Sequence, residues 1–184
     1  MVSPPTHVLA VYSELLGPSK VALFPVYGIV IAALCSNIPP LPPSTLLSQR
    51  KGSNHSPPQD LVVSVPIIPT KLPSVEMFQP LLSYLYTRNV NQLFDCLLPF
   101  DIGSDESMEE AAKRHAQTVA LKQLLNEASR VQAIWSNIIA LGIFDDDLFS
   151  SVEMVWNIYS VALEEAARKD QEVLPSALEN AFHI

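Results

Sequence analysis

The stretch that decides the fold of this 184-residue chain spans residues 61–99 and reads LVVSVPIIPTKLPSVEMFQPLLSYLYTRNVNQLFDCLLP. An apolar run suited to a β-strand leads through closely spaced prolines into two amphipathic helical segments, which Thr87-Arg88-Asn89 separates. Apolar and aromatic residues are denser here than anywhere outside the last helices. The stretch therefore predicts the junction between a β-rich first half and a helical second half.

The prolines separate the same two halves. Fourteen of the 16 prolines lie in residues 1–80, and proline fixes φ and removes a backbone donor, so long helices belong to the second half. In the first half, strands are expected at 7–15 and 20–26, joined by a turn at Gly17-Pro18. Apolar residues then recur at helical spacing over Tyr27–Asn37, which predicts a short helix.

The deciding stretch itself predicts one strand and two short helices. The strand is expected at Leu61–Val65, and the prolines of the PIIP sequence that follows restrict it to a sheet edge or to its early residues. Ser74 is expected to cap the first helix, in which Pro80 requires either a kink or a new helix start. Leu82 and Leu85 lie on its apolar face. The second helix is expected at Asn91–Leu98.

Two long helices are expected in the second half. Ser107-Met108-Glu109-Glu110 has the form of a capping box, and a helical pattern follows as far as Leu141, with a break near Asn126–Ser129 as an alternative. Gly142 fits a helix stop, and Asp145-Asp146-Asp147 opens the final helix. The expected core residues of the two helices are Leu121, Leu124, Leu125, Ala128, Val131, Trp135, Ile138 and Ile139, and Leu148, Val152, Val155, Trp156, Tyr159 and Leu163.

These elements predict an α+β fold, in which a small, proline-edged β-sheet from residues 7–70 packs beside a helical half at 74–169. The expected organisation is an N-terminal segment at 1–19, a single α+β domain at 20–170 and a tail at 171–184. A mobile proline-rich loop is expected inside the domain at about 39–60. The polar tail is expected to be frayed or to add one short turn.

Charge and hydropathy argue against two classes of partner, nucleic acids and membranes. Residues 81–184 hold seven basic and 16 acidic residues, and because an acidic surface repels phosphate, direct nucleic-acid binding is not expected. The apolar run VALFPVYGIVIAALC at 21–35 is 15 residues long, shorter than the ~20 residues that span a bilayer. A buried strand followed by a helix is expected there, with a membrane segment as the alternative. No basic region of a secretory signal is found at the N-terminus.

The sequence contains no motif that indicates a known reaction, because the catalytic, metal-binding and nucleotide-binding motifs HExxH, GxSxG, CxxC and GxGxxG are all absent. His115 is expected on a solvated helix face, and the three aspartates are explained by helix capping, with a metal site as the alternative. Cys35 and Cys96 are expected to be buried free thiols, with a disulfide or redox switch as the alternative. We expect no enzymatic activity, cofactor, metal or small-molecule substrate.

Several residues are candidates for contact with a protein partner or for regulation. Trp135 and Trp156 lie on apolar helix faces, where core packing is the first interpretation and a partner anchor the second. Tyr84 and Tyr86 point to opposite sides of their helix, so one of them is expected to be less buried. The candidate partner contacts are Tyr84, Tyr86 and Trp156. Ser56 precedes a proline and is a candidate phosphorylation site, and PPLPP at 39–43 is either a stiff connector or an SH3 ligand.

Three segments together resemble a known family. They are FPVYGIVIAALCSNIPPLPPS at 24–44, VPIIPTKLPSVEMFQPLLSYLYTRNVNQLFDCLLP at 65–99 and IWSNIIALGIFDDDLFSSVEMVWNIY at 134–159. In this order and spacing the chain is similar to the basidiomycete clampless-type family, regulators of clamp-cell formation and sexual (dikaryotic) development. The resemblance implies an intracellular, non-enzymatic regulator in the nucleus or cytoplasm that acts through protein partners, transcriptional regulators among them. It brings no catalytic residues.

A more distant resemblance concerns the fold. The order of strand, helix, strand and FQPLLSYLYTRNV at 78–90 is similar to that of BTB/POZ domains. A BTB domain usually has a His where Tyr27 stands and a Gly where Arg88 stands, and the insert at 39–58 is long for that connection. This resemblance implies a divergent BTB/POZ-like arrangement and a second candidate function, a homodimerising scaffold or adaptor of an unrelated pathway.

Overall fold

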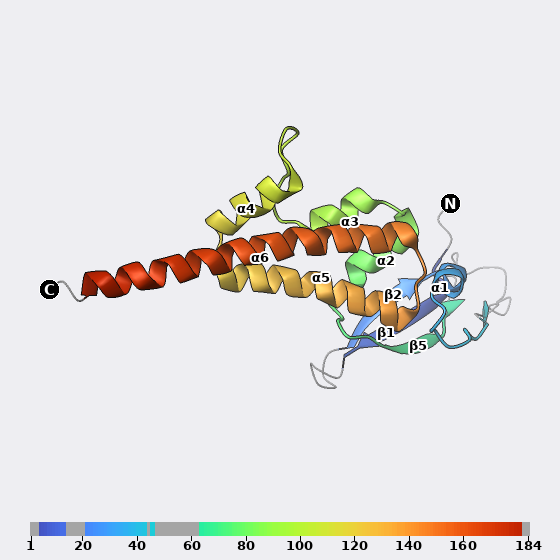
Figure 1. Ribbon diagram of the computed structural model, residues 1–184. Helices are drawn as coiled ribbons and strands as arrows, with labels where there is room; N and C mark the ends of the chain where they lie inside the picture. The colour runs from blue at the N-terminus through green and yellow to red at the C-terminus, as the bar shows by residue number, and fades with distance from the viewer. Residues whose placement is uncertain (1–3, 14–20, 44, 47–62, 182–184) are drawn as a thin grey trace, which may run out of the picture. The chain divides into compact units, whose positions relative to one another are not determined.

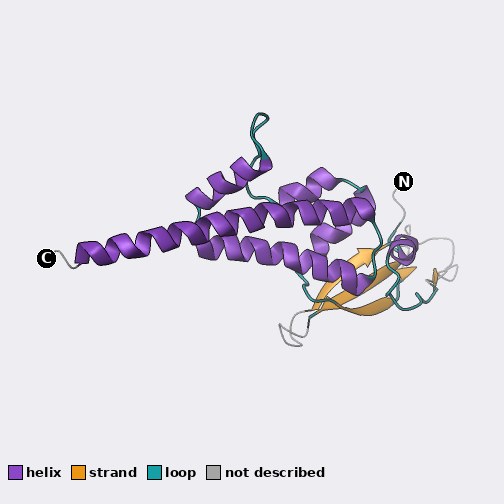
Figure 2. Ribbon diagram, viewed as in Figure 1, coloured by secondary structure: helices purple, strands orange, loops and turns teal. Residues whose placement is uncertain are grey.

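The computed structural model describes residues 4–13, 21–43, 45–46 and 63–181 (Figures 1 and 2). The chain divides into two compact units. Unit 1 comprises Met1–Glu76 and Asn137–Phe144, and unit 2 comprises Met77–Ser136 and Asp145–Ile184. The described strands all lie in unit 1, whereas unit 2 is helical. The predicted α+β class, with a small sheet followed by a helical half, is confirmed.

Unit 1 is built on a three-stranded sheet in which β1 (His7–Tyr12) lies between β2 (Val21–Val26) and β5 (Ile67–Lys71), as Figure 2 shows in orange. β1 runs antiparallel to β2 and parallel to β5. The pairing of the first two strands is therefore the one predicted. The predicted turn at Gly17-Pro18 lies outside the described residues.

Prolines lie in both edge strands of this sheet. Pro25 of β2 pairs with Val8, and Pro69 of β5 pairs with Ala10. The N–H of Leu72 donates to the Tyr12 carbonyl of β1. Since N–H groups alternate in direction along a strand, the missing N–H of Pro69 faces away from β1 and costs no hydrogen bond. The prediction of a proline-edged sheet holds for this physical reason.

The third strand lies later in the chain than the sequence indicated. Of the expected strand at Leu61–Val65, the described part forms only the short β4 (Val63–Ser64), which pairs with β3 (Thr45–Leu46). The strand that joins β1 begins at Ile67, after Pro66. The prediction was wrong because it ended the strand before Pro66, whereas an edge strand accommodates Pro69.

The helix α1 (Gly28–Leu34) follows β2, as the run at 21–35 predicted. The buried apolar residues of unit 1 come from one face of the sheet and the residue that follows it, from α1 and its C-cap, and from the segment Asn137–Phe144, in which a long helix ends at Leu141: Leu9, Val11, Val26, Ile31, Cys35, Ile68, Leu72, Ile138, Leu141 and Ile143. Asn137 reaches into the same unit, where its side-chain amide binds both the N–H and the carbonyl of Ser74, at 3.0 and 2.7 Å.

Unit 2 begins with α2 (Phe78–Thr87) and α3 (Val90–Leu97). The prediction that Ser74 caps α2 was wrong, because the helix begins four residues later. Pro80 is then the third helical residue, where the N–H has no partner within the helix and no kink is needed. Leu82 and Leu85 are buried, as predicted.

The expected single helix over 107–141 is a pair, α4 (Met108–Thr118) and α5 (Leu121–Leu141). The capping box of Ser107 and Glu110 is present as predicted. The break lies at Val119-Ala120 instead of near Asn126–Ser129. Thr118 turns its hydroxyl back to the His115 carbonyl at 2.9 Å, and the Val119 N–H closes the helix on the same carbonyl.

The last helix, α6, runs from Asp146 to Ala181 and passes through Pro175, where a frayed tail had been expected. The Asp145 carboxylate accepts the N–H of Leu148 at 3.1 Å, so the first of the three aspartates caps the helix, as predicted. The buried apolar stripe of α6 recurs in steps of three and four, with Ile158 buried beside it: Leu148, Val152, Val155, Tyr159, Ala162 and Ala166. Opposing alanines allow α6 to pack closely on α4, through Ala112, Ala116, Ala162 and Ala166.

Candidate protein-interaction site

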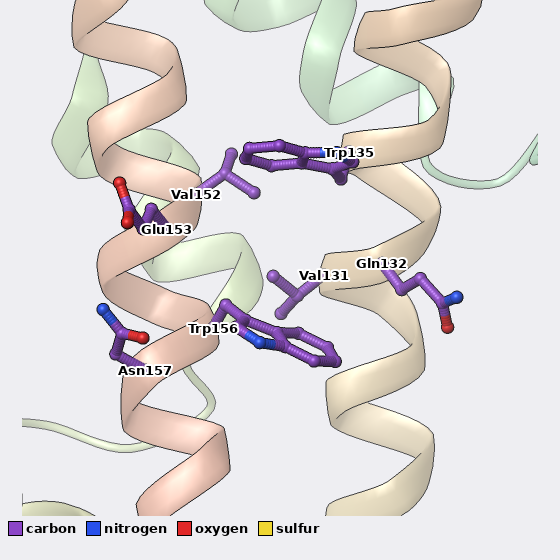
Figure 3. A pocket seen from close by; sticks show the side chains of 7 residues that line it. All are labelled: Val131, Gln132, Trp135, Val152, Glu153, Trp156 and Asn157. Atoms are coloured by element: carbon purple, nitrogen blue, oxygen red, sulfur yellow. The ribbon is translucent and has the colours of Figure 1, made fainter.

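A hollow of about 410 Å³ lies between α5 and α6 within unit 2, and we call it the tryptophan groove. Val131 and Val152 form its buried floor. Trp135 from α5 and Trp156 from α6 lie over this floor, each reaching toward the opposite helix (Figure 3). Polar residues complete the lining: Gln132, Glu153 and Asn157.

Both tryptophans are exposed, Trp135 by 40% and Trp156 by 44%. Each directly follows a fully buried residue, Ile134 on α5 and Val155 on α6. One residue step turns an α-helix by about 100°, so both indoles lie at the edge of the core stripe and not within it. The first interpretation, core packing of the two tryptophans, was therefore wrong. No sequence signal excluded Trp156 from the core, because it lies four residues after Val152, at helical spacing.

The side chain of Trp135 is positioned by a contact within unit 2. Its ring packs edge-on against Phe149, with ring centroids 5.3 Å apart and an interplanar angle of 71°. This edge-to-face geometry is the favourable arrangement for aromatic pairs. An aromatic side chain that is both exposed and fixed loses little conformational entropy on binding, which is the property of an interface anchor.

A second hollow, of about 400 Å³, lies on the other side of α6. It shares Glu153 and Asn157 with the tryptophan groove, so these two residues form a ridge between the hollows. Its apolar lining includes Met108 and Met154, which are 44% and 37% exposed. Methionine adapts its shape to a bound surface, so this hollow extends the apolar surface around Trp156.

His115 lies in the core of unit 2, and the prediction of a solvated position was wrong. Its Nε2 is 2.7 Å from the Glu127 carboxylate, both side chains are buried, and its ring stacks on Phe100 with centroids 4.1 Å apart. Twelve residues of one helix would span about 18 Å, so the turn between α4 and α5 is what brings the pair together. Neither of the two hollows reaches His115.

Two family models match the chain, the Clampless protein 1 N-terminal domain over residues 2–73 and the Clampless protein 1 C-terminal domain over residues 67–181. The chain belongs to the clampless family. This membership connects it with clamp formation in fungi. No curated protein and no solved structure matches the chain, so the distant BTB/POZ resemblance stays a prediction.

The two clampless domains and the two structural units do not divide the chain at the same places. The C-terminal clampless domain includes Asn137–Phe144, which structurally belongs to unit 1. Among the described residues of this family member, no helix has the length and apolar character needed to cross a bilayer.

The structure separates the predicted contact residues of this clampless protein. Tyr84 is buried, and its hydroxyl donates to the Asp145 carboxylate at 3.3 Å, so its side chain does not face a partner. Burial raises the pKa of this hydroxyl above its ordinary value. Tyr86 is 38% exposed and, with Trp156, remains a candidate contact. Ser56 lies outside the described residues.

The two cysteines of this family member differ in burial. Cys35 is a buried free thiol, as expected, whereas Cys96 is partly exposed and borders a hollow of about 210 Å³ between α2 and α3. That hollow is lined by no histidine or carboxylate. Arg130 donates to the Cys96 carbonyl at 2.8 Å, which holds α5 against the end of α3.

A second apolar surface lies in unit 1, on the face of the sheet opposite its core. We call it the sheet face, and it consists of Val8, Ala10 and Tyr12 of β1, Val21, Leu23 and Pro25 of β2, and Ile67, Pro69 and Lys71 of β5. Leu23 is 61% and Ile67 62% exposed. The solvent face of a small sheet ordinarily carries polar residues, so this composition marks a second candidate contact surface of the clampless fold.

Proposed function

We propose that the chain is a non-enzymatic regulator of clamp-cell formation and sexual (dikaryotic) development, and that it acts by binding a protein through the tryptophan groove. The observation that carries the proposal is the exposure of both tryptophans of the chain on one apolar hollow. Exposed tryptophans are the residues most enriched at the energetic centres of protein interfaces. A regulator that works in the nucleus or cytoplasm, with transcriptional regulators among its partners, fits this proposal.

The absence of enzymatic activity is part of the proposal. The buried pair of His115 and Glu127 is satisfied by its own contacts, since Gln123 also donates to the Glu127 carboxylate at 2.9 Å. A general base must reach its substrate within hydrogen-bond distance. Among the described residues that line the tryptophan groove, Glu153 is the sole ionisable one, and one carboxylate on a rim supplies no catalytic pair.

The test replaces the chromosomal copy with a variant carrying Trp135→Ala and Trp156→Ala. We expect hyphae without clamp cells although the protein accumulates to its normal level. Leu125→Ala is the matched control, because Leu125 is 53% exposed on α5 and does not line the groove. Normal clamp cells in the tryptophan variant would show that the groove is not the working surface.

The sheet face supports the second candidate function, a homodimerising scaffold. Eight of the nine residues of this face are uncharged, and Lys71 lies at the end of β5 beside Tyr12, so two copies can form a largely apolar contact, as in the interfaces of obligate dimers. Light scattering after size exclusion, at several concentrations, measures the mass. A dimer that Leu23→Lys converts to a monomer supports this function, with Ile29→Lys as control because Ile29 is 81% exposed on α1. A monomer at all concentrations excludes it.

A further inference from the structure

The tryptophan groove is one helical turn long. Val131 and Trp135 are four residues apart on α5, and Val152 and Trp156 are four apart on α6. Figure 3 shows Trp135 at the level of Val152 and Trp156 at the level of Val131. A four-residue step rises about 6 Å along a helix, so the two indoles bracket a length that one turn of a partner helix matches.

The size of the groove limits what enters it. A helix with its side chains is about 10–12 Å in diameter, too large for a hollow of about 410 Å³. A partner helix therefore lies over the groove and inserts large side chains from positions i and i+4, the usual form of helix-in-groove recognition. Both walls of the groove are helices and offer no strand edge, so an extended peptide finds no backbone partner there.

The rim of the groove is acidic. Glu153 is its sole charged lining residue and makes no ion pair with any residue in the described part of the chain. On the other side of the ridge the second hollow adds Glu109, which is paired with Lys113, and unit 2 as a whole has seven basic and 16 acidic residues. A partner that brings positive charge gains from this field, whereas the acidic unit 2 of a second copy is repelled from the groove.

We propose that the tryptophan groove binds an amphipathic helix that inserts large apolar side chains between Trp135 and Trp156 and places Lys or Arg against Glu153. This inference rests on the proposed function and names the chemistry of the partner. Opposite charge at the rim sets the orientation of the helix and the rate of encounter, while the indoles and the two valines supply the apolar contact.

The chain contains two tryptophans, and both lie in the groove. Their two indole N–H signals in a ¹H–¹⁵N spectrum, and the tryptophan fluorescence, therefore report on this site alone. The probes are three designed helical peptides with the same leucine face and with lysine, glutamine or glutamate flanks. With the full chain we expect the lysine peptide to shift both indole signals and to bind at least about tenfold more tightly than the glutamate peptide, with the difference reduced by salt.

Two substitutions test the role of the rim. Glu153→Lys is expected to weaken the binding of the lysine peptide and to strengthen the binding of the glutamate peptide. Glu164→Lys makes the same charge change on an exposed position of α6 about three turns away and is expected to leave the order of the peptides unchanged. Trp156→Phe is expected to keep part of the binding, and Trp156→Ala to lose it with an unchanged far-UV circular dichroism spectrum.

Three results would overturn the inference. They are equal affinity for the lysine and glutamate peptides, an effect of Glu164→Lys as large as that of Glu153→Lys, and indole signals that no peptide shifts. Indole signals that move with protein concentration alone, together with a doubled mass, would identify a second copy as the occupant and also overturn it. If no peptide binds but hyphae that carry the variant with Trp135→Ala and Trp156→Ala still lack clamp cells, the proposed function stands. Only the proposed chemistry of the partner is then wrong.

Discussion

The Ser36 hydroxyl donates a hydrogen bond of 2.9 Å to the carbonyl of Gly142, a residue 106 positions later in the chain. The Ser36 N–H binds the same carbonyl at 3.2 Å, and the Asn37 amide donates to the carbonyls of Ile139 and Ala140. The last carbonyls of a helix have no partner within it. In unit 1 they are satisfied by the two residues that follow α1 and its C-cap.

Gly142 makes this arrangement available, and its replacement is expected to be costly. Its φ of +64° belongs to the left-handed region, and an added Cβ would lie 2.2 Å from the Ser36 Oγ. We expect Gly142→Ala to lower the free energy of unfolding by about 1–3 kcal/mol. Gly103→Ala is the control, because Gly103 has an ordinary φ and its Cβ would meet Glu106 Cβ at 3.4 Å. Equal stability of the two variants in chemical denaturation would contradict this account.

The buried pair of His115 and Glu127 is expected to couple strongly. Glu127→Ala leaves a buried ring nitrogen without its partner, at a cost of about 1–3 kcal/mol in the free energy of unfolding. A double-mutant cycle with His115→Ala measures the coupling. The exposed pair of Lys113 and Glu109 on α4 serves as control and is expected to show no resolvable coupling. Additive effects at the buried pair would show that its contact is not stabilising.

The Glu106 carboxylate is expected to make stability depend on pH. The Arg114 guanidinium binds both of its oxygens at 2.8 Å and, together with the Gly103 N–H, lowers the pKa of Glu106 from 4.5 to about 2. A carboxyl whose pKa is lower in the folded state stabilises the fold above its unfolded pKa and loses that contribution as pH falls toward the folded pKa. Unfolding of Glu106→Gln should thus be easier than that of the unaltered chain at neutral pH, with the difference vanishing as pH falls from about 4.5 to about 2.

Asp105→Asn is the control for this experiment, since it removes the same charge from the neighbouring residue without touching the contact with Arg114. A difference between the Glu106→Gln variant and the unaltered chain that stays constant through the acid range would contradict the assignment to this ion pair.

The two thiols are expected to react at different rates. Burial raises the pKa of Cys35 to about 11, so at mildly alkaline pH its thiolate is scarce as well as enclosed. Cys96 is partly exposed. Iodoacetamide followed by mass spectrometry should modify Cys96 first and Cys35 only on unfolding, and Cys96→Ser should then give an almost unreactive native chain. Rapid labelling of Cys35 in that variant would show that its site opens without unfolding.

Local sequence was sufficient where a structure depends on hydrogen bonds between near neighbours. The capping box of Ser107 and Glu110, the Asp145 cap and the stop at Gly142 each close within a few residues, and all three were predicted. In the stop, the Ile143 N–H binds the Ile138 carbonyl and the Gly142 N–H binds the Ile139 carbonyl. The pairing of β1 with β2 also follows from a short connection in the sequence.

Predictions failed where the outcome depends on a neighbour far away in the sequence. The shift of the third strand to Ile67–Lys71 depends on its parallel pairing with β1, and the break between α4 and α5 places His115 beside Glu127. Similarly, the local sequence favours Ser74 as a helix cap, but the side-chain amide of Asn137 binds the N–H and the carbonyl of Ser74. The spacing of residues within one segment does not indicate which distant residue each of these groups contacts.

The sequence by itself determined the α+β class, the edge positions of the prolines, the helix caps at Ser107 and Asp145, the helix stop at Gly142 and the membership of the clampless family. Only the tertiary structure decided which apolar residues are core and which are surface. Trp135 and Trp156 lie on apolar stripes that are wider than the helices packed against them, so both indoles stay exposed. The exposure of a side chain depends on the shape and distance of the neighbouring elements. Helical periodicity gives no information on either.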